Sequence, residues 1–457
     1  MANQEQQQFK IVDAYITADR LGGDGNRINV NNMIVELVLF ENLEKPYVTG
    51  NVAILDDAGV FDGMSFSGTE RISFGISSEK DTDPSSGLKF RTFIMSSIEN
   101  LIKASDNGNS GLYVFTLIDE HAVLSKAKKI SRTVKGSLET EIQRICTTDL
   151  NKQIDISYIY EGGELNEKAK VASIQNEFKA IIPYMHPLEA CEWLRDRATT
   201  RSGCPFFLYA SMHDENIRLG NLEVMLKQKA FNSKLPYIFA PSNVQKAEEG
   251  SDIQKQFQIQ TMRAAKMQNT MNQLMSGGIG SLYSNTNLNT GRITSSHFNV
   301  NTLLSELKNS GVIPESKEQN VFDDSFKFDQ TEDLLGEYNA KVFHTVTSSG
   351  TYDRFKSYHD EFDPIKFQKK VENLAVRNML YKNMFEVTVP GAGFIIAKAS
   401  VGDIVRIDVL ADNAENENSS EKFDQLRSGD FLIYNIRHTF KNTRHDVAMT
   451  VCKLTRG

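Results

Sequence analysis

Four short runs near the end of the chain decide the fold: NMFEVTVPG (383–391), VGDIVRIDVL (401–410), SGDFLIYNIRHTF (428–440) and RHDVAMTVCKL (444–454). Each run is rich in β-branched, aromatic and other apolar residues, and polar or Gly-containing turns separate them. This layout is typical of consecutive strands. The third run combines a Gly-Asp turn, an apolar strand and an Arg-His ending. We predict that these runs form the closing sheet of a β-barrel that assembles with copies of itself.

A second group of strands is predicted between Phe9 and Ser125. In Arg71–Ser77 apolar and polar residues alternate, which indicates a strand with one buried and one wet face. Met33–Phe40 is almost continuously apolar, which favours a strand covered on both faces. Strands separated by turns in this way predict a sandwich or a barrel. The predicted strands are Phe9–Thr17, Met33–Phe40, Gly50–Leu55, Arg71–Ser77, Lys89–Glu99 and Leu112–Ile118.

The middle of the chain reads as a mixture of helices and strands. Pro187 is placed to open a helix, because the first helical position needs no backbone N–H. The longest predicted helix is Asp252–Met275, whose methionine stripe we assign to core packing in preference to a binding face. Other predicted elements are a helix around 138–145, a hairpin at 205–219, a short helix at 222–227, polar strands at 283–300, a helix near 300–309 and a helix opened by Pro364.

Composition limits the possible functions. The 457 residues suggest two to four domains, and 51 basic against 59 acidic residues give a formal net charge of −8. Tight binding to a nucleic-acid backbone needs clustered positive charge, so this balance argues against it, although DNA could still slide through a passage. The start of the chain lacks a signal peptide, and no run approaches a transmembrane length. We therefore expect a soluble protein made in the cytoplasm.

Residues that could support catalysis or metal binding are scattered. The four cysteines form no CxxC pair, and we interpret them as buried, reduced thiols. Gly277–Ser281 (GGIGS) lacks the strand and helix of a dinucleotide site, so it is interpreted as a helix stop. Gly63–Gly68 misses the nucleophile-elbow pattern by one residue. His438 and His445 could meet across a hairpin, but a solvated turn is the favoured interpretation.

One further pattern, Lys89, Arg91 and Phe93 on a single predicted strand, hints at stacking with single-stranded nucleic acid, but it is isolated. The acidic stretch Asp412–Ser428 is interpreted as a surface loop; a contact arm to a neighbouring protein is the alternative. We predict no catalytic, cofactor-binding or metal-binding residue, no cofactor and no enzymatic activity.

Three stretches taken together resemble a known family. They are ENLEKPYVTGNVAILDDAGVFDGMSFSGTERISFGIS (41–77), HPLEACEWLRDRATTRSGCPFFLYASMHDENIRLGNLEVML (186–226) and SGDFLIYNIRHTF with HDVAMTVCKL near the end. In order and in turn positions they resemble the baseplate central hub protein (tail hub) of contractile-tailed bacteriophages. The resemblance covers most of the chain and rests on layout, without a catalytic motif.

The resemblance implies a mainly β, α+β fold with two tube-like antiparallel β-barrels plus α+β cup domains. It implies a homotrimer that forms a pseudo-sixfold ring, adapts the threefold spike to the sixfold tail tube, and lines a channel for DNA and the tape-measure protein. Expected partners are the spike protein, the tail tube protein or a tube-initiating adaptor, and other baseplate wedge proteins. The expected location is the tail baseplate of the virion, assembled in the host cytoplasm.

On this basis we divide the chain into four parts: a first tube-like barrel at residues 1–124, a cup domain at 125–235, a second barrel at 236–300 and 383–457 interrupted by helices, and a mixed segment at 301–382 that completes the cup. The chain is longer than two barrels and a compact cup need, and it carries no lysozyme-like segment. Alternatives are the hub of a related contractile injection system, such as a type VI or tailocin particle, and a cell-wall hydrolase.

Overall fold

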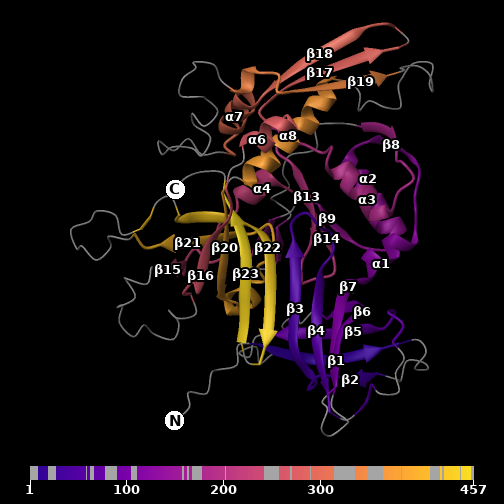
Figure 1. Ribbon diagram of the computed structural model, residues 1–457, viewed down its shortest axis with the longest axis vertical. Helices are drawn as coiled ribbons and strands as arrows, with labels where there is room; N and C mark the ends of the chain where they lie inside the picture. Colours follow the sequence, from indigo (N-terminus) through magenta and orange to yellow (C-terminus); the bar gives the residue numbers. More distant parts are fainter. Residues whose placement is uncertain are drawn as a thin grey trace.

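A computed structural model gives the fold (Figure 1). It describes residues 9–18, 27–57, 59–61, 66–77, 90–103, 111–156, 159–161, 164–166, 178–200, 202–240, 257–267, 270–288, 290–312, 335–347, 364–381, 383–411, 423–424, 427–442 and 444–453. The structure is mainly β with a helical part, so the predicted α+β, mainly β class is confirmed.

One 13-stranded sheet dominates the molecule, in the order β16-β20-β23-β22-β3-β4-β7-β6-β5-β1-β2, with β21 and β15 attached to β22. Most of its strands come from the two ends of the chain, and the yellow and indigo ribbons of Figure 1 run side by side where they meet; β15 and β16 come from the middle. Their bounds are β1 Lys10–Thr17, β2 Ile28–Asn29, β3 Ile34–Asn42, β4 Thr49–Asp56, β5 Arg71–Ser77, β6 Arg91–Lys103, β7 Gly111–Asp119, β15 Tyr237–Phe239, β16 Thr261–Met267, β20 Asn383–Pro390, β21 Ile404–Val409, β22 Gly429–Lys441 and β23 Arg444–Cys452.

The first strand unit, β1 to β7, folds over on itself around its own core. Strand alternation sends Leu37 and Leu39 of β3 and Val52 and Ile54 of β4 to one face. There they pack with Phe74 of β5 and the other apolar residues of one cluster. The opposite face of β3 stays partly open, since Phe40 is 39% exposed. Within one chain, the prediction that this strand is covered on both faces is therefore wrong.

The second strand unit, formed by β15, β16 and β20 to β23, repeats the plan of the first. In each unit a 13-residue strand, β6 or β22, lies at one side of a four-stranded layer. The first residues of each of these strands pair with a strand outside that four-stranded layer, β5 in the first unit and β21 in the second. Each is interrupted at its sixth residue, Ser96 or Tyr434, where the register shifts. The two units are thus structural repeats of one another.

An α+β part fills the middle of the chain. Helices α2 (Leu138–Asp149) and α3 (Pro187–Arg195) pack together against a sheet of β13 (Phe206–Ala210), β14 (Ile217–Asn221) and β9 (Ile154–Ile156). Pro187 opens α3 as predicted, and the side chain of Glu189 reaches back to the N–H of His186 as in a capping box. The smaller elements are α1 Glu120–Ala127, β8 Thr133–Gly136, β10 Ile159–Glu161, β11 Glu164–Asn166, β12 Phe178–Ile181 and α4 Leu222–Leu226.

A separate three-stranded sheet lies at the top of Figure 1. Strands β17 (Gly280–Asn287) and β18 (Ile293–Asn299) form a hairpin, and β19 (Lys341–Thr347) pairs with β17 in parallel. Helices α7 (Val300–Asn309) and α8 (Pro364–Leu380) pack against each other, and α8 lies against β17 and β18. The remaining helical segments are α6 Thr270–Ser276, α9 Ala392–Ala397 and η3 Leu335–Glu337.

The long helix predicted at Asp252–Met275 is wrong. Its described part contains a strand, β16, which pairs with β20, and the short helix α6. Met262 packs on the second unit's core while Thr261 and Arg263 are exposed, which is the alternation of a strand. Hydrogen bonding to β20 therefore overrides the local helix preference. Residues 252–256 and 268–269 of the prediction lie outside the described residues.

Candidate functional site

Among the described residues, the layer of the large sheet that runs from β16 to β6 has an open edge at each end, one in each strand unit. In the part of the chain that the structure describes, β6 pairs with β5 only at its beginning, and from Ser96 onward it pairs with β7 alone. At the other end of the same layer, β16 pairs with β20 alone. Ser96–Asn100 is exposed at every residue, with Ile98 43% and Ile102 54% exposed. Long edges that expose apolar residues are ready to pair with another strand.

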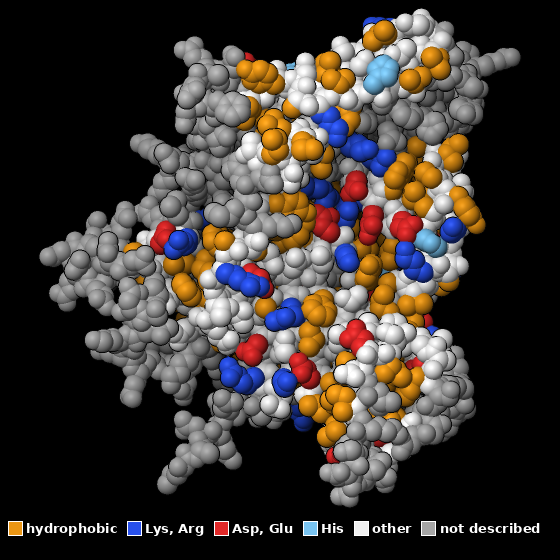
Figure 2. All heavy atoms as spheres, viewed as in Figure 1, with side chains coloured by type: hydrophobic (Ala, Val, Ile, Leu, Met, Phe, Trp, Pro, Cys, Tyr) orange, Lys and Arg blue, Asp and Glu red, His pale blue; other side chains and the backbone are white. Residues whose placement is uncertain are grey.

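Between these edges lies an eight-stranded layer, from β16 to β6, whose outer face carries charged side chains as well as exposed apolar ones such as Phe40 and Leu55. Charged side chains on neighbouring strands neutralise each other there: Arg263 pairs with Glu386 at 2.7 Å, and Lys441 pairs with Glu36 at 3.0 Å. Figure 2 shows basic and acidic side chains interspersed on the visible face of the molecule. The face therefore carries charges of both signs without a dominant basic patch.

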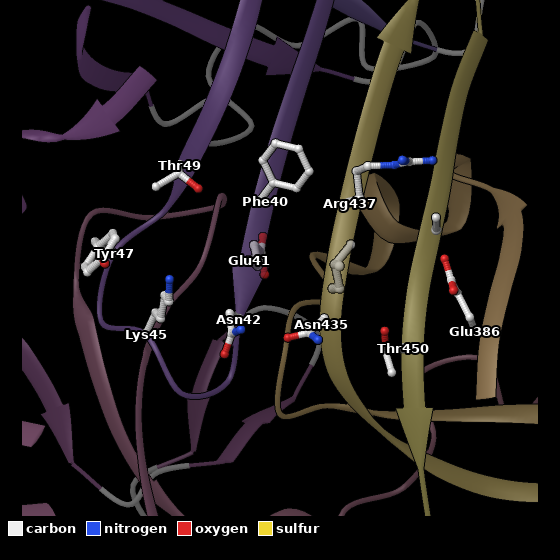
Figure 3. Close-up of a pocket in the computed structure, with 12 residues that line it drawn as sticks. Phe40, Glu41, Asn42, Lys45, Tyr47, Thr49, Glu386, Asn435, Arg437 and Thr450 are labelled. Atoms are coloured by element: carbon white, nitrogen blue, oxygen red, sulfur yellow. The ribbon is translucent and has the colours of Figure 1, made fainter. Parts of the chain in front are cut away.

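A trough of about 300 Å³ crosses this face where β3 of the first unit meets β22 of the second (Figure 3). Asn42 and Asn435 face each other across the two strands, and the small side chains Ala448 and Thr450 of β23 continue the floor. The walls are larger side chains. They are Phe40, Lys45, Tyr47, Arg437 and Glu386.

We call the line along which β3 pairs with β22 the seam. Glu41 lies beneath it, on the buried face of the sheet, and joins three parts of the chain. Its carboxylate accepts hydrogen bonds from the backbone N–H of Met212 in the middle region (2.8 Å) and from the hydroxyl of Ser400 in the second unit (2.6 Å). The N–H of Val401 donates to the same carboxylate at 3.2 Å. His438 Nε2 lies 3.6 Å from Glu41 Oε1. A single buried carboxylate thus links β3, the loop after β13 and the segment before β21.

The ionisable groups around Glu41 have displaced pKa values. Burial disfavours the charge of Glu41, but the imidazoles of His438 and His213 and the hydroxyl of Ser400 outweigh it and lower its pKa to about 2. Burial lowers the pKa of His213 to about 4, although Glu41 opposes the shift. Burial, together with the neighbouring His438 and His213, also lowers the pKa of His445. Burial raises the pKa of Asp403 to about 6.

Glu44 forms a second node at the other end of the seam. Its carboxylate pairs with Arg195 of α3 at 3.1 Å and with Arg377 of α8. The hydroxyl of Tyr434 in β22 donates to it at 3.0 Å, and Tyr381 lies 2.7 Å from that hydroxyl. The two arginine side chains are almost fully buried, and Glu44 is the carboxylate that they share; Arg195 also pairs with Asp196 at 2.9 Å.

The structure brings His438 and His445 together, and it places them in the protein interior, not in a solvent-exposed turn. Their ring nitrogens Nδ1 and Nε2 are 3.1 Å apart and both residues are fully buried. The interpretation as a solvated turn is wrong, because alternation along β22 places His438 on the same inner face as Ile436 and Phe440. Sequence reasoning missed Glu41 and Glu44. The only sequence signal for their burial is that each is a carboxylate in or beside an apolar strand, which is weaker than the alternation that indicates the burial of His438.

Arg91 and Phe93 do not form a stacking surface. Both are buried, and Arg91 is paired with Asp119 at 2.6 Å. A charged residue on the inner face of a strand needs such a partner, so the pattern is structural. Lys89 lies outside the described residues, as do residues 63–65 of the near-elbow and most of the Asp412–Ser428 stretch.

Two other predictions are confirmed. Helix α6 ends at Ser276, and Gly277 follows with φ +81° in the left-handed region that glycine adopts freely. All four cysteines are buried and free, as predicted. The described residues contain no group of three or more His, Cys, Asp or Glu side chains placed to hold a metal ion. Among the same residues, no helix is both long and apolar enough to cross a membrane.

Comparisons with known proteins find similarity in structure only. No family model and no curated protein sequence matches the chain. The tail protein from Neisseria meningitidis MC58 superposes with a TM-score of 0.51 at 10% identity, covering 98% of this chain and 97% of that one. A 43 kDa tail protein of prophage MuSo2 from Shewanella oneidensis gives 0.45 at 9% identity, with coverage of 96% and 98%. A type VI secretion component from E. coli gives 0.41 at 7% identity, with coverage of 92% and 73%.

The first of these similarities establishes the fold. It extends over nearly the whole of both chains, so the strand units and the middle region share one arrangement with the Neisseria tail protein. At 10% identity it carries no residue roles across.

Proposed function

We propose that this chain is a structural component of a phage tail, the hub that joins the spike to the tail tube. In this role three copies form a ring, the ring presents pseudo-sixfold symmetry to the tube, and no residue performs bond chemistry. The observation that supports the proposal most strongly is the internal repeat, because one chain already contains the type of junction that the ring would need between chains.

The junction within the chain is the pairing of β3 with β22. Residues Asn435–Lys441, which follow the bulge at Tyr434 in β22, pair with Glu36–Asn42 of β3. The equivalent residues after the bulge in β6 are Ser97–Lys103, and they form an open edge in the described structure. The edge strand equivalent to β3 is β16, which is also open and also offers seven residues. We infer that β6 of one copy pairs with β16 of the next.

Strand direction allows this closure. Successive strands from β16 to β6 are all antiparallel to their neighbours. With eight strands in the layer, the first and last run in opposite directions, so the pairing between copies is antiparallel as well. Closing the ring in this way removes both open edges, which is how β-structures avoid uncontrolled edge pairing.

The number of copies follows from the symmetry that must be matched. Two repeats per chain and three chains give six equivalent four-stranded layers, which suits a threefold spike on one side and a sixfold tube on the other. Closed cyclic symmetry is the usual solution for such assemblies. The layer's outer face would then line the channel. Its charges of both signs, without a row of cations, suit a passage for DNA and the tape-measure protein, since tight binding to a backbone needs clustered cations.

In this role the middle region and the upper three-stranded sheet would form the cup that contacts the spike, and the tube protein or its adaptor would extend the ring. Other baseplate wedge proteins would surround it. The chain would reside in the virion tail baseplate after assembly in the host cytoplasm. The domain boundaries given above stay a prediction.

Cross-linking between copies tests the inferred junction. A second register shift in β6, between Ile98 and Asn100, makes Asn100 equivalent to Arg437, so the repeat places it opposite Ala265 of β16 in the next copy. Because all native cysteines are buried, a short bis-maleimide should react with the double variant N100C/A265C and give a ladder that ends at the covalent trimer. The matched control N100C/L235C carries its second cysteine on the exposed Leu235 of the middle region. Equal cross-linking of both variants, or of neither, would contradict the junction.

A further inference from the structure

Arg437 is a cation on the seam that its neighbours leave unpaired. Its directly opposite residues are Phe40 on β3 and Ala448 on β23, neither of which carries charge. The guanidinium is exposed and, within the described part of the chain, takes part in no ion pair. Lys441, four residues further along the same strand and on the same face, is opposite Glu36 and pairs with it.

The trough beside Arg437 contains further groups that could contact a ligand. Lys45, at one end, is exposed and has no carboxylate partner among the described residues; its ammonium lies 5.9 Å from the ring of Tyr47. On the floor, Asn435 Oδ1 is buried with no hydrogen-bond partner in the described structure. The ring of Phe40 adds an exposed apolar wall. The one carboxylate that lines the far wall, Glu386, is already held by Arg263 through two nitrogens.

We propose that this trough binds an extended acidic segment of a partner protein. A carboxylate of the segment pairs with Arg437, a geometry that guanidinium favours through paired N–H donors. An apolar neighbour packs on Phe40, and a backbone N–H of the segment donates to Asn435 Oδ1. The volume of about 300 Å³ fits a few side chains, not a folded domain.

The number and placement of the cations in the trough favour an acidic peptide segment over DNA. Two free cations, Arg437 and Lys45, with Glu386 at the far wall, make a local site for one or two carboxylates. A duplex instead requires a row of cations along its backbone. The inference rests on the proposed function in one respect: three such troughs would face the channel, where a segment threaded through the ring would meet them.

The test uses the full-length protein and a fluorescein-labelled octapeptide of alternating Leu and Glu, followed by anisotropy. The reference probe is the same peptide with Gln in place of Glu. The acidic peptide should bind at least tenfold more tightly than the Gln peptide, and R437Q should remove at least tenfold of that affinity. The control K441Q removes a cation of the same face that is already paired, and should change the affinity less than twofold.

Three outcomes would overturn the proposal: equal affinity for the two peptides, an equal loss in K441Q and R437Q, or a 20-base-pair DNA that binds more tightly than the peptide in an Arg437-dependent way. Light scattering on the same samples separates this inference from the proposed function. A ring without peptide binding contradicts only the trough, and peptide binding by a monomer contradicts only the ring.

Discussion

At the scale of single residues, Glu41 has an environment that depends on distant parts of the chain. Its acceptor oxygens serve donors from residues about 170 and 360 positions away. No sequence pattern reveals such a node, because the partners meet only after the two strand units have joined. His438 is different: its place between Ile436 and Phe440 in an alternating strand already indicates the buried face.

Replacing Glu41 with Ala should destabilise the fold strongly. The variant leaves the hydroxyl of Ser400 and the N–H groups of Met212 and Val401 buried without an acceptor, so we expect a loss of about 3 kcal/mol in the free energy of unfolding. Chemical denaturation measures it. The control E36A removes a half-exposed carboxylate paired with Lys441 and should cost under about 1 kcal/mol. Similar losses in both variants would contradict the role of Glu41.

Acidification should weaken the same region. The folded-state pKa of His213, about 4, lies below its ordinary value of 6.5, and that of His445 is also lowered. The folded state therefore binds fewer protons than the unfolded state, and stability falls as the pH drops from about 6.5 to about 4. Asp403, raised to about 6, acts in the opposite direction below pH 6.

The melting temperature measured between pH 7 and 4 tests these signs. It should fall on acidification in the natural protein, and it should fall more steeply below pH 6 in D403N, where the opposing group is gone. A melting temperature that rises from pH 6.5 to 4 would contradict the lowered pKa values of His213 and His445.

At the scale of elements, strands with clean alternation and turns with proline or glycine were predictable. Arg71–Ser77 and the hairpin at 205–219 agree with β5, β13 and β14. The strand β16 was not predictable, because residues 252–275 carry a helix-like apolar spacing and the strand exists by pairing with β20, more than 100 residues away. Edge strands depend on their neighbour for their conformation, so local sequence determines them poorly.

The turn before α9 contains a close approach that a larger residue would break. A Cβ at Gly391 would lie 2.2 Å from Nδ1 of His445, inside the packed histidine pair. G391A should therefore lose about 2 kcal/mol or more in denaturation experiments. G278A is the control, since its Cβ would lie 3.3 Å from the amide of Asn378; a loss no larger than this control's would contradict the tight packing of His445.

The edge of β6 should control assembly without controlling folding. Ile98 and Ile102 are exposed in one chain, and lysines there place charge in the inferred junction. The double variant I98K/I102K should stay folded by circular dichroism and run as a monomer in light scattering. L235K, at a residue 49% exposed in the middle region, should keep the mass of the natural protein. An unchanged mass in I98K/I102K would contradict an interface at β6.

At the scale of the whole molecule, the two strand-rich ends and the mixed middle could be read from the sequence, and the mainly β fold agrees. The joining of the two ends into one sheet could not. Glu36 and Lys441 are 405 residues apart in the chain, and alternation tells which side chains share a face but not which strand lies next to which. The trough and both carboxylate nodes exist only because of that junction.

Glu44 should couple the strand units to the helical parts. E44A leaves Arg195 and Arg377 buried without their shared carboxylate, and we expect a loss of about 3 kcal/mol. Calorimetry should show a single transition in the natural protein and a broadened or divided one in E44A, as α3 and α8 loosen from the sheet. An unchanged, single transition in E44A would contradict this coupling.

A closed ring of three chains is distinguished most directly from a single chain by its mass. Size-exclusion chromatography with multi-angle light scattering at micromolar concentration should give three times the chain mass of 51.4 kDa. A stable, folded monomer at that concentration would contradict the account.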